Sequence, residues 1–279
     1  MTFKSLLTVL TSSERTESAL EHIIDLAKSL DAHADALCLG VDRTQSGYFY
    51  AGTNALILQE TLTRATAEAA ELAKIATDRL AASGLRWACE EGVAQLPDLG
   101  RHVARRARFS DLVVLPKPYG EGSGIEAEPV VESALFEGHA PVLIVPETRC
   151  QLANPGTVVV GWNDSVEAMR AVRRSLPFLM KADLVRIVII DPAQHGPDRS
   201  DPGGLLSQML ARHGVNCEID VLGKTLTRVS DVLNRHLTDT NADLLVMGAY
   251  GHSRFREAIL GGATRNMLEH SVVPVFMAH

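Results

Sequence analysis

Residues Asp243 to Phe276 read DLLVMGAYGHSRFREAILGGATRNMLEHSVVPVF, and this stretch decides the fold class. It opens with a continuous apolar run, which is typical of a strand buried on both faces of a sheet. A loop that begins with Gly248 follows, then a segment with helical periodicity, and a second apolar run closes the stretch. Strand, loop, helix and strand in this order predict a parallel βαβ unit.

The first half of the chain repeats this plan. DLVVLPKPYG begins at Asp111 and HAPVLIVPE begins at His139, at nearly the spacing seen in the second half. The openings of the two halves also match, with SLLTVLTSSERTESALEHIIDLA in the first and TVVVGWNDSVEAMRAVRRSLPFL in the second. We therefore predict two tandem doubly wound (Rossmann-like) α/β domains, each with a mostly parallel five-stranded sheet.

The segment PETRCQLANPG, residues 146–156, is polar, carries two prolines and lacks periodicity. This composition indicates a linker, so the predicted domains are residues 1–150 and 151–279. Apolar runs predict strands in the second half, and amphipathic patterns predict helices between them. The expected strands are Thr157–Gly161, Leu184–Ile190, Cys217–Leu222, Asp243–Met247 and Val273–Met277, and the expected helices are Ser165–Leu179, Leu205–His213, Val229–Thr238 and Arg254–His270, with a long first-half helix over Leu56–Leu80.

Two further local features follow from this pattern. The closing runs Val142–Val145 and Val273–Met277 look like exposed apolar edges, which invite strand pairing. Ser13 and Ser165 occupy equivalent points before the first helix of each half. A helix N-cap explains these two serines better than a catalytic role does, because acidic residues follow each of them in the expected first turn.

Composition limits the function. Hydrophobic residues make up 46% and charged residues 22% of the 279, as in ordinary soluble globular proteins. The net charge of −7 argues against binding of bare nucleic acid. The cysteines form no CxxC motif, which favours a reducing compartment, and the N-terminal apolar run is too short for a signal peptide or a membrane span. We therefore expect a cytoplasmic protein with no nucleic-acid or membrane partner.

The spacing of glycines after the strand at Asp243–Met247 carries the functional signal. Gly248 and Gly251 are three apart, and Gly261 and Gly262 follow after nine intervening residues. Glycine lets a ligand approach the backbone closely, and the free N–H groups of a helix N-terminus point at an anion. Thr264 adds a hydroxyl. A plain tight turn explains the first glycine pair equally well, and the pattern is neither a Walker loop nor a GxGxxG fingerprint.

The full pattern of strand, GxxG, nine residues and a second glycine resembles that of the universal stress protein family, whose ATP-binding members carry G-x2-G-x9-G-(Ser/Thr). The likeness extends over the second half, through VVVGWNDS, IVIIDP, MGAYGH and VVPVFM. The first half resembles a degenerate second copy. The chain therefore looks like a tandem universal stress protein.

The resemblance implies that the second half binds an adenine nucleotide, ATP or else ADP or AMP, with or without Mg²⁺. It places the adenine-contacting position on Asn163 and a wall of the site on Ile189, while ribose and phosphate contacts fall on the glycine loop. The implied cofactor-binding residues are Asn163, Ile189, Met247, Gly248, Gly251, His252, Gly261, Gly262, Ala263 and Thr264. The family often has Asp where Asn163 stands, and a Ser or Thr where Gly262 stands.

The first half departs further from the family pattern. After DLVVL it reads PKPYGEGSGIEAEP, in which Pro116 and Pro118 lack N–H groups, and Glu121, Glu126 and Glu128 would repel phosphate. Thr11 stands where the second half has Asn163. We predict no nucleotide in this half, which would act as a structural partner or bind something apolar. The resemblance also implies that the closing strands pair the halves as an internal pseudo-dimer, and that a homodimer can form.

No catalytic residue and no metal-ligand spacing emerge from the sequence. His252 and Arg254 flank the glycine loop, where a phosphate contact and a solvated role are equally open; Asp164 and Asp191 could approach a metal ion on a phosphate. Three functions remain in view. They are a nucleotide-binding stress or regulatory protein with little or no turnover, a slow ATPase or related enzyme, and a scaffold that binds no nucleotide.

Overall fold

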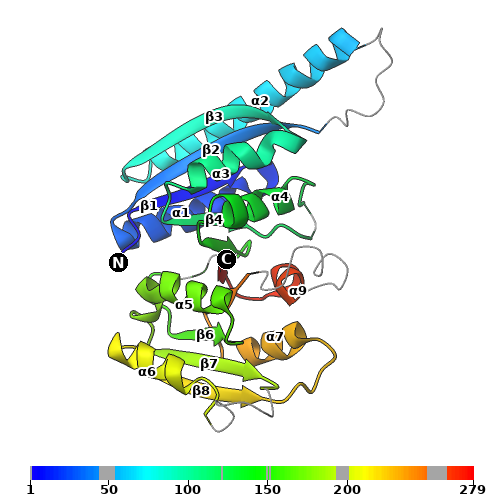
Figure 1. Ribbon diagram of the computed structural model, residues 1–279. Coiled ribbons are helices and arrows are strands. Elements are labelled where there is room, and N and C mark those ends of the chain that lie inside the picture. The colour runs from blue at the N-terminus through cyan, green and yellow to red at the C-terminus, as the bar shows by residue number, and fades with distance from the viewer. Residues whose placement is uncertain are drawn as a thin grey trace. The chain divides into compact units, whose positions relative to one another are not determined.

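Strands, most of them paired in parallel, alternate with helices along most of the computed structural model, which describes residues 2–43, 54–120, 122–148, 150, 152–192, 201–249 and 263–279 (Figure 1). The chain divides into two units. One comprises Phe3–Ala140, and the other comprises Pro141–His279 together with the first two residues. The α/β class and the mostly parallel sheet match the prediction from the apolar runs.

The unit Phe3–Ala140 contains a parallel sheet with strand order β3-β2-β1-β4. Helices α1 and α2 pack together, and α2 lies along β2 and β3; helices α3 and α4 pack together with the short helix η4 (Figure 1). The elements are β1 (Ser5–Leu10), η1 (Ser13–Arg15), α1 (Thr16–Leu30), β2 (His33–Asp42), α2 (Asn54–Ala81), β3 (Trp87–Gln95), η3 (Leu96–Asp98), α3 (Leu99–Ala107), β4 (Leu112–Pro116), α4 (Ala127–Glu132) and η4 (Ser133–Glu137).

The unit Pro141–His279 contains a sheet with strand order β5-β10-β9-β6-β7-β8, in which the β5–β10 pair is antiparallel and the other described pairs are parallel. Its core includes Phe178 and Phe276, whose rings meet edge to face with centroids 5.9 Å apart. The elements are β5 (Val142–Val145), β6 (Thr157–Gly161), α5 (Val166–Leu179), β7 (Leu184–Ile190), α6 (Gly204–Arg212), β8 (Cys217–Leu222), α7 (Val229–Asp239), β9 (Leu244–Gly248), α9 (Ala263–His270) and β10 (Val275–Ala278).

The two units repeat one another in strand order, because β3-β2-β1-β4 corresponds to β8-β7-β6-β9. One carboxylate marks the correspondence in each unit. Asp111 Oδ2 accepts hydrogen bonds from the backbone N–H groups of Lys4 and Ser5, at 2.7 and 3.0 Å. Asp243 Oδ2 accepts the equivalent pair from Gly156 and Thr157, at 2.8 and 3.0 Å. Each aspartate thus joins the start of a central strand to the start of its neighbour.

The closing strands are not left as exposed edges, because they pair with each other as their apolar character predicted. β5 and β10 are buried along their whole lengths. They pair with each other antiparallel, with Leu143 opposite Phe276, and β10 pairs with β9 on its other side. The pairing itself removes the edge that each apolar run would otherwise present to water. Val142–Val145 joins the second unit by this pairing although it precedes residue 150, and the boundary near residue 150 stays a proposal.

The helix start in the first half differs from the prediction by one residue. Ser12 is the N-cap of η1, where its side chain accepts a hydrogen bond from Glu14 N at 3.4 Å. Ser13 lies inside η1, and α1 begins at Thr16. A single turn of 3₁₀ helix before α1 moves the cap back, which periodicity alone does not reveal. Ser165 is the N-cap of α5, as expected.

Length and apolar character decide whether a helix can cross a membrane. The longest described helix, α2, spans 28 residues. Among the residues that the structure describes, none of the helices has the length and apolar character needed to traverse a bilayer.

Candidate functional site

The candidate site lies where the strand order of the second unit reverses. β6 pairs with β7, the next strand in the chain, on one side and with β9 on the other, and the chain then runs from β9 through α9 to β10. Ligands of doubly wound sheets bind beyond the carboxyl ends of the strands at such a switch point. Gly161 pairs with Met247 at the carboxyl ends of β6 and β9. The fold therefore brings Asn163 and Gly248 to the same edge of the sheet.

A tight turn carries Asn163 out of β6. The turn begins with Trp162 N donating to Val188 O at 2.9 Å. Asn163 is exposed, and its Oδ1 accepts a hydrogen bond from Ser165 N at 3.3 Å. Asp164 takes a left-handed φ of 57°, which a short polar side chain tolerates. Ser165 Oγ then accepts from Ala168 N at 3.1 Å and begins α5. No hydrogen bond to another described residue uses the Asn163 NH₂ group.

Gly248 is required by packing, a reason that the sequence did not reveal. A Cβ built on Gly248 would lie 2.5 Å from Ala168 N and 2.8 Å from the Glu167 carbonyl carbon. The backbone of the first turn of α5 therefore sits directly against the end of β9. We expected glycine here so that a ligand could approach, and the described contact is instead with a helix.

The remaining predicted site residues differ in burial, and some of them lie outside the described residues. Ile189, on β7, is 6% exposed, and Met247 is half-buried. Thr264 lies in the first turn of α9, where it is 3% exposed, and Ala263 begins that helix. Gly251, His252, Gly261 and Gly262, together with Arg254, lie outside the described residues, so their predicted contacts with phosphate stay predictions.

Two carboxylates stand at the ends of neighbouring strands. Asp164 follows β6, and Asp191 follows β7 with a φ of 50° and its N–H donated to Leu222 O at 2.8 Å. Both are exposed. Within the described part of the chain, no three His, Cys, Asp or Glu side chains are grouped so that they could hold a metal ion.

The equivalent place in the first unit lies between β1 and β4. The correspondence of the two aspartates and of the strand registers aligns Thr11 with Asn163 and Pro116 with Gly248. Pro116 ends β4 and has no N–H to offer a phosphate. A hollow of about 40 Å³ remains here, lined by Thr11, Arg15 and Lys117 among others. Small-molecule sites typically measure about 300–1,000 Å³.

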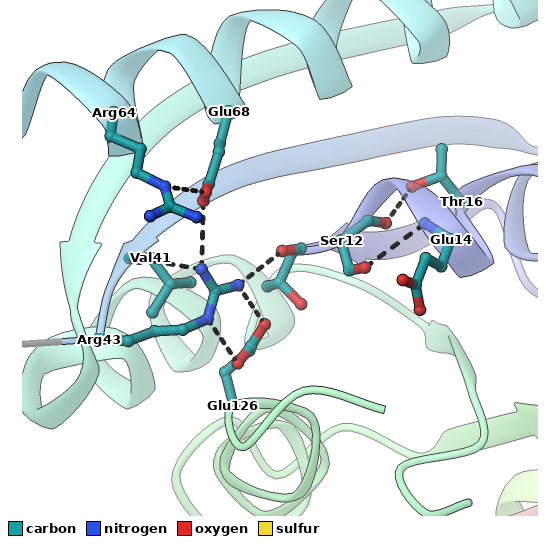
Figure 2. A network of polar contacts seen from close by, with 9 residues as sticks. Ser12, Glu14, Thr16, Val41, Arg43, Arg64, Glu68 and Glu126 are labelled. Carbon is teal, nitrogen blue, oxygen red and sulfur yellow. Dashed lines mark hydrogen bonds and ion pairs between the residues drawn. The ribbon is translucent and has the colours of Figure 1, made fainter. Parts of the chain in front are cut away.

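A buried ion pair lies beside this hollow (Figure 2). Glu126 is fully buried, and its carboxylate accepts two hydrogen bonds from Arg43, at 2.6 Å from Nη2 and 3.2 Å from Nε. Arg43 Nη2 also donates to Thr11 O at 3.3 Å, and Arg43 Nη1 pairs with Glu68 at 3.2 Å. The hydrogen bond with Glu126 raises the pKa of the Arg43 guanidinium above its ordinary value.

Glu126 was predicted to repel phosphate as a free charge, and this interpretation was wrong. Its charge is neutralised by Arg43, which lies 83 positions earlier in the chain. A second arginine, Arg15, lines the hollow, and its Nη1 donates to Lys117 O at 2.6 Å and to Tyr119 O at 3.4 Å. Sequence reasoning missed both arginines because nothing local marks a partner so far along the chain.

The fold and the switch point define a doubly wound α/β protein with a candidate small-molecule edge in its second unit. Residues 156–279 match the model of the universal stress protein family. This second half of the chain therefore carries a universal stress protein domain.

Three relatives show how far the similarity reaches. A universal stress protein from Synechocystis sp. is 26% identical over 136 residues, which are 48% of this chain and 45% of that protein. The crystal structure of a universal stress protein from Archaeoglobus fulgidus has a TM-score of 0.72 at 16% identity, covering 98% of this chain and 95% of that one. A structure from the same organism in complex with dAMP covers 52% of this chain and 98% of that one, at 14% identity and a TM-score of 0.32.

Proposed function

We propose that residues 151–279 form an adenine-nucleotide-binding domain, and that the protein is a cytoplasmic stress-response or regulatory protein with little or no turnover. The observation that carries the proposal is the pairing of Gly161 with Met247 at the switch point. This pairing brings the Asn163 turn and the start of the glycine loop to one edge of the sheet, where doubly wound folds hold their ligands.

Each part of this edge has a proposed role. The Asn163 amide, which offers both donors and an acceptor, would meet the edge of the adenine ring. Ile189 and Met247 would form the apolar wall. The backbone from Gly248 to Thr264 would hold the ribose and the phosphates, and Asp164 and Asp191 would face any Mg²⁺ carried on the phosphates. The dAMP bound by the relative from Archaeoglobus fulgidus indicates the class of ligand to test.

The proposal predicts one nucleotide site per chain. In the first unit, Pro116 and the small hollow support the absence of a nucleotide there. The purified protein should be denatured and its released small molecules identified by mass spectrometry. Titration calorimetry with AMP, ADP and ATP, with and without Mg²⁺, then gives the stoichiometry. A value near one supports the proposal, and a value near two contradicts the assignment of the first unit.

Matched variants at equivalent positions locate the site. Asn163→Ala removes the proposed adenine contact, and affinity should fall roughly three- to tenfold, since one hydrogen bond contributes about 1 kcal/mol. Asn163→Asp keeps the acceptor for Ser165 N and should retain binding. Thr11→Ala, at the equivalent point of the first unit, should leave affinity unchanged. Gly248→Asp is a poor test, because any side chain there meets α5 before it meets a ligand.

The two alternatives give different results. A protein that releases no nucleotide and shows no binding heat with any of the three would be a nucleotide-independent scaffold. Turnover of ATP above about one per minute would indicate a slow ATPase, although typical enzymes turn over far faster.

We also propose that the two halves act as an internal pseudo-dimer and that two chains form a homodimer. The antiparallel pairing of β5 with β10 supports the first part, because it joins the closing strand of each half. Light scattering of the purified chain tests the second part. A measured mass of one chain at micromolar protein concentration would contradict the proposed homodimer.

A further inference from the structure

Two cysteines from different strands meet beneath α2. Cys38 lies on β2 and Cys89 on β3, and their sulfur atoms are 3.7 Å apart. The strand register places Cys89 opposite Ala36 and Cys38 opposite Glu91, so the two side chains are diagonal neighbours on one face of the sheet. This face is covered by α2, whose Ala73 carbonyl lies 3.8 Å from Cys89 Sγ.

The two thiols differ in environment. Cys38 is fully buried, whereas Cys89 is partly exposed on a strand that, among the described strands, pairs with β2 alone. The hydrogen bond from Cys38 lowers the pKa of the Cys89 thiol to about 7, against the opposing effect of burial. The same hydrogen bond, with burial, raises the pKa of the Cys38 thiol. Of the two sulfurs, Cys89 is therefore the one that loses its proton more readily and the one that meets solvent.

We propose that Cys38 and Cys89 form a reversible oxidation site, in which a hydroperoxide converts the two thiols into an intramolecular disulfide. Cys89, which is accessible, is the attacking sulfur, and Cys38, which is enclosed beside it, is the resolving sulfur. This inference concerns the first unit and is independent of the nucleotide proposed for the second.

The chemistry balances in two steps. The Cys89 thiolate attacks the hydroperoxide, an S–O bond forms as the O–O bond breaks, and the alcohol or water leaves with one proton. The Cys38 sulfur then attacks Cys89, an S–S bond forms as the S–O bond breaks, and water leaves with the proton from Cys38. The two thiols lose two electrons, and the peroxide gains them. A dithiol reductant reverses the reaction by thiol–disulfide exchange.

The geometry sets the character of the disulfide. An S–S bond is about 2.0 Å long, so the sulfurs must close by roughly 1.7 Å. β3 has room to move because its other side is unpaired among the described strands. A bond that needs such a shift is more readily reduced than a relaxed structural disulfide, which suits a reversible site.

The test uses the full chain and hydrogen peroxide at pH 7, followed by denaturation, alkylation of remaining thiols and peptide mass spectrometry. We expect two of the four thiols to be lost and a peptide pair joined through Cys38 and Cys89, restored to free thiols by dithiothreitol. Loss confined to Cys150 or Cys217, or a sulfinic acid at Cys89 with Cys38 still reduced, would overturn the proposal.

Single variants separate the two roles. In Cys38→Ala, peroxide should leave a sulfenic acid at Cys89 that dimedone traps, and no disulfide should form. In Cys89→Ala, Cys38 should stay reduced. Cys217→Ala is the matched control, since Cys217 is also half-buried on a strand but has no cysteine partner, and it should leave the disulfide yield unchanged. In Cys38→Ser, which keeps a hydrogen-bond donor beside Cys89, equal dimedone labelling of Cys89 and Cys217 would contradict the assigned attacking sulfur.

Discussion

A Cβ atom on Gly248 would lie 2.5 Å from the backbone nitrogen of Ala168, so the end of β9 and the first turn of α5 are in direct backbone contact. The atoms that a side chain would meet belong to the main chain and cannot rotate away. The same contact places the N-terminus of α5 beside the proposed ligand edge.

Gly248→Ala should therefore destabilise the second unit by about 1–3 kcal/mol, the usual cost of overpacking. Urea unfolding followed by circular dichroism measures the change. Gly161→Ala is the control, because a Cβ there has its nearest atoms, on Leu233 and Met247, at 3.7 Å. Equal midpoints for the two variants would show that the contact between β9 and α5 is looser than described.

Ser165→Ala should cost about 1 kcal/mol of stability, because it removes the N-cap hydrogen bond to Ala168 N. Ser13→Ala is the paired comparison. Ser13 occupies the equivalent sequence position but lies exposed inside η1, where Ser12 provides the cap. Thermal unfolding should therefore show a lower Tm for the first variant and little change for the second. A comparable fall in Tm in both variants would show that Ser13 also caps the helix.

Glu126→Gln should destabilise the first unit by about 1–3 kcal/mol, since it leaves the Arg43 guanidinium without the charge that it faces in a buried setting. The substitution keeps size and shape, so the loss measures charge. Glu68→Gln removes the more exposed partner of the same arginine and should cost less than about 1 kcal/mol. Chemical unfolding of both variants measures the two losses of stability. A larger loss in Glu68→Gln than in Glu126→Gln would show that Glu68 is the main ion-pair partner of Arg43.

Asp31 gives the first unit a pH dependence in acid. Hydrogen bonds from Lys4 Nζ at 3.2 Å and Arg86 Nη2 at 2.8 Å lower the pKa of its carboxyl below the ordinary value. A folded-state pKa below the unfolded one means that this contribution is fully present above about pH 4 and is lost as pH falls through the folded value. The size is small, because Asp31 is exposed.

Carbon-detected NMR titration of the Asp31 carboxyl checks this prediction. The midpoint should lie below that of an ordinary aspartate and should rise in Arg86→Gln. Asp31→Asn should flatten the acid limb of the stability curve while keeping the left-handed backbone, φ 49°, that ends α1. An unshifted midpoint in the wild type would show that the two cations do not engage the carboxylate in solution.

Much of the secondary structure could be predicted from the sequence, because it depends on the local pattern of apolar and polar residues. Continuous apolar runs predicted β6, β7 and β8 at the bounds that the structure has, and the helical periodicity predicted α5 and α7 to within about a residue. The spacing of Gly248 and Gly251 predicted a ligand site at the edge of the sheet where β6 and β9 end. The position of Ser12 was missed because a 3₁₀ turn shifts the cap without changing the apolar pattern.

Other features depend on which segments meet, and the sequence is silent on this. The order of apolar and polar residues determined the repeated βα plan, since burial on both faces of a parallel sheet requires it. Only the tertiary structure decided the register in which β5 pairs with β10, that Arg43 neutralises Glu126, and that Cys38 meets Cys89. Each of these contacts joins positions 51 or more residues apart, where register and strand order, rather than local propensity, set the neighbours.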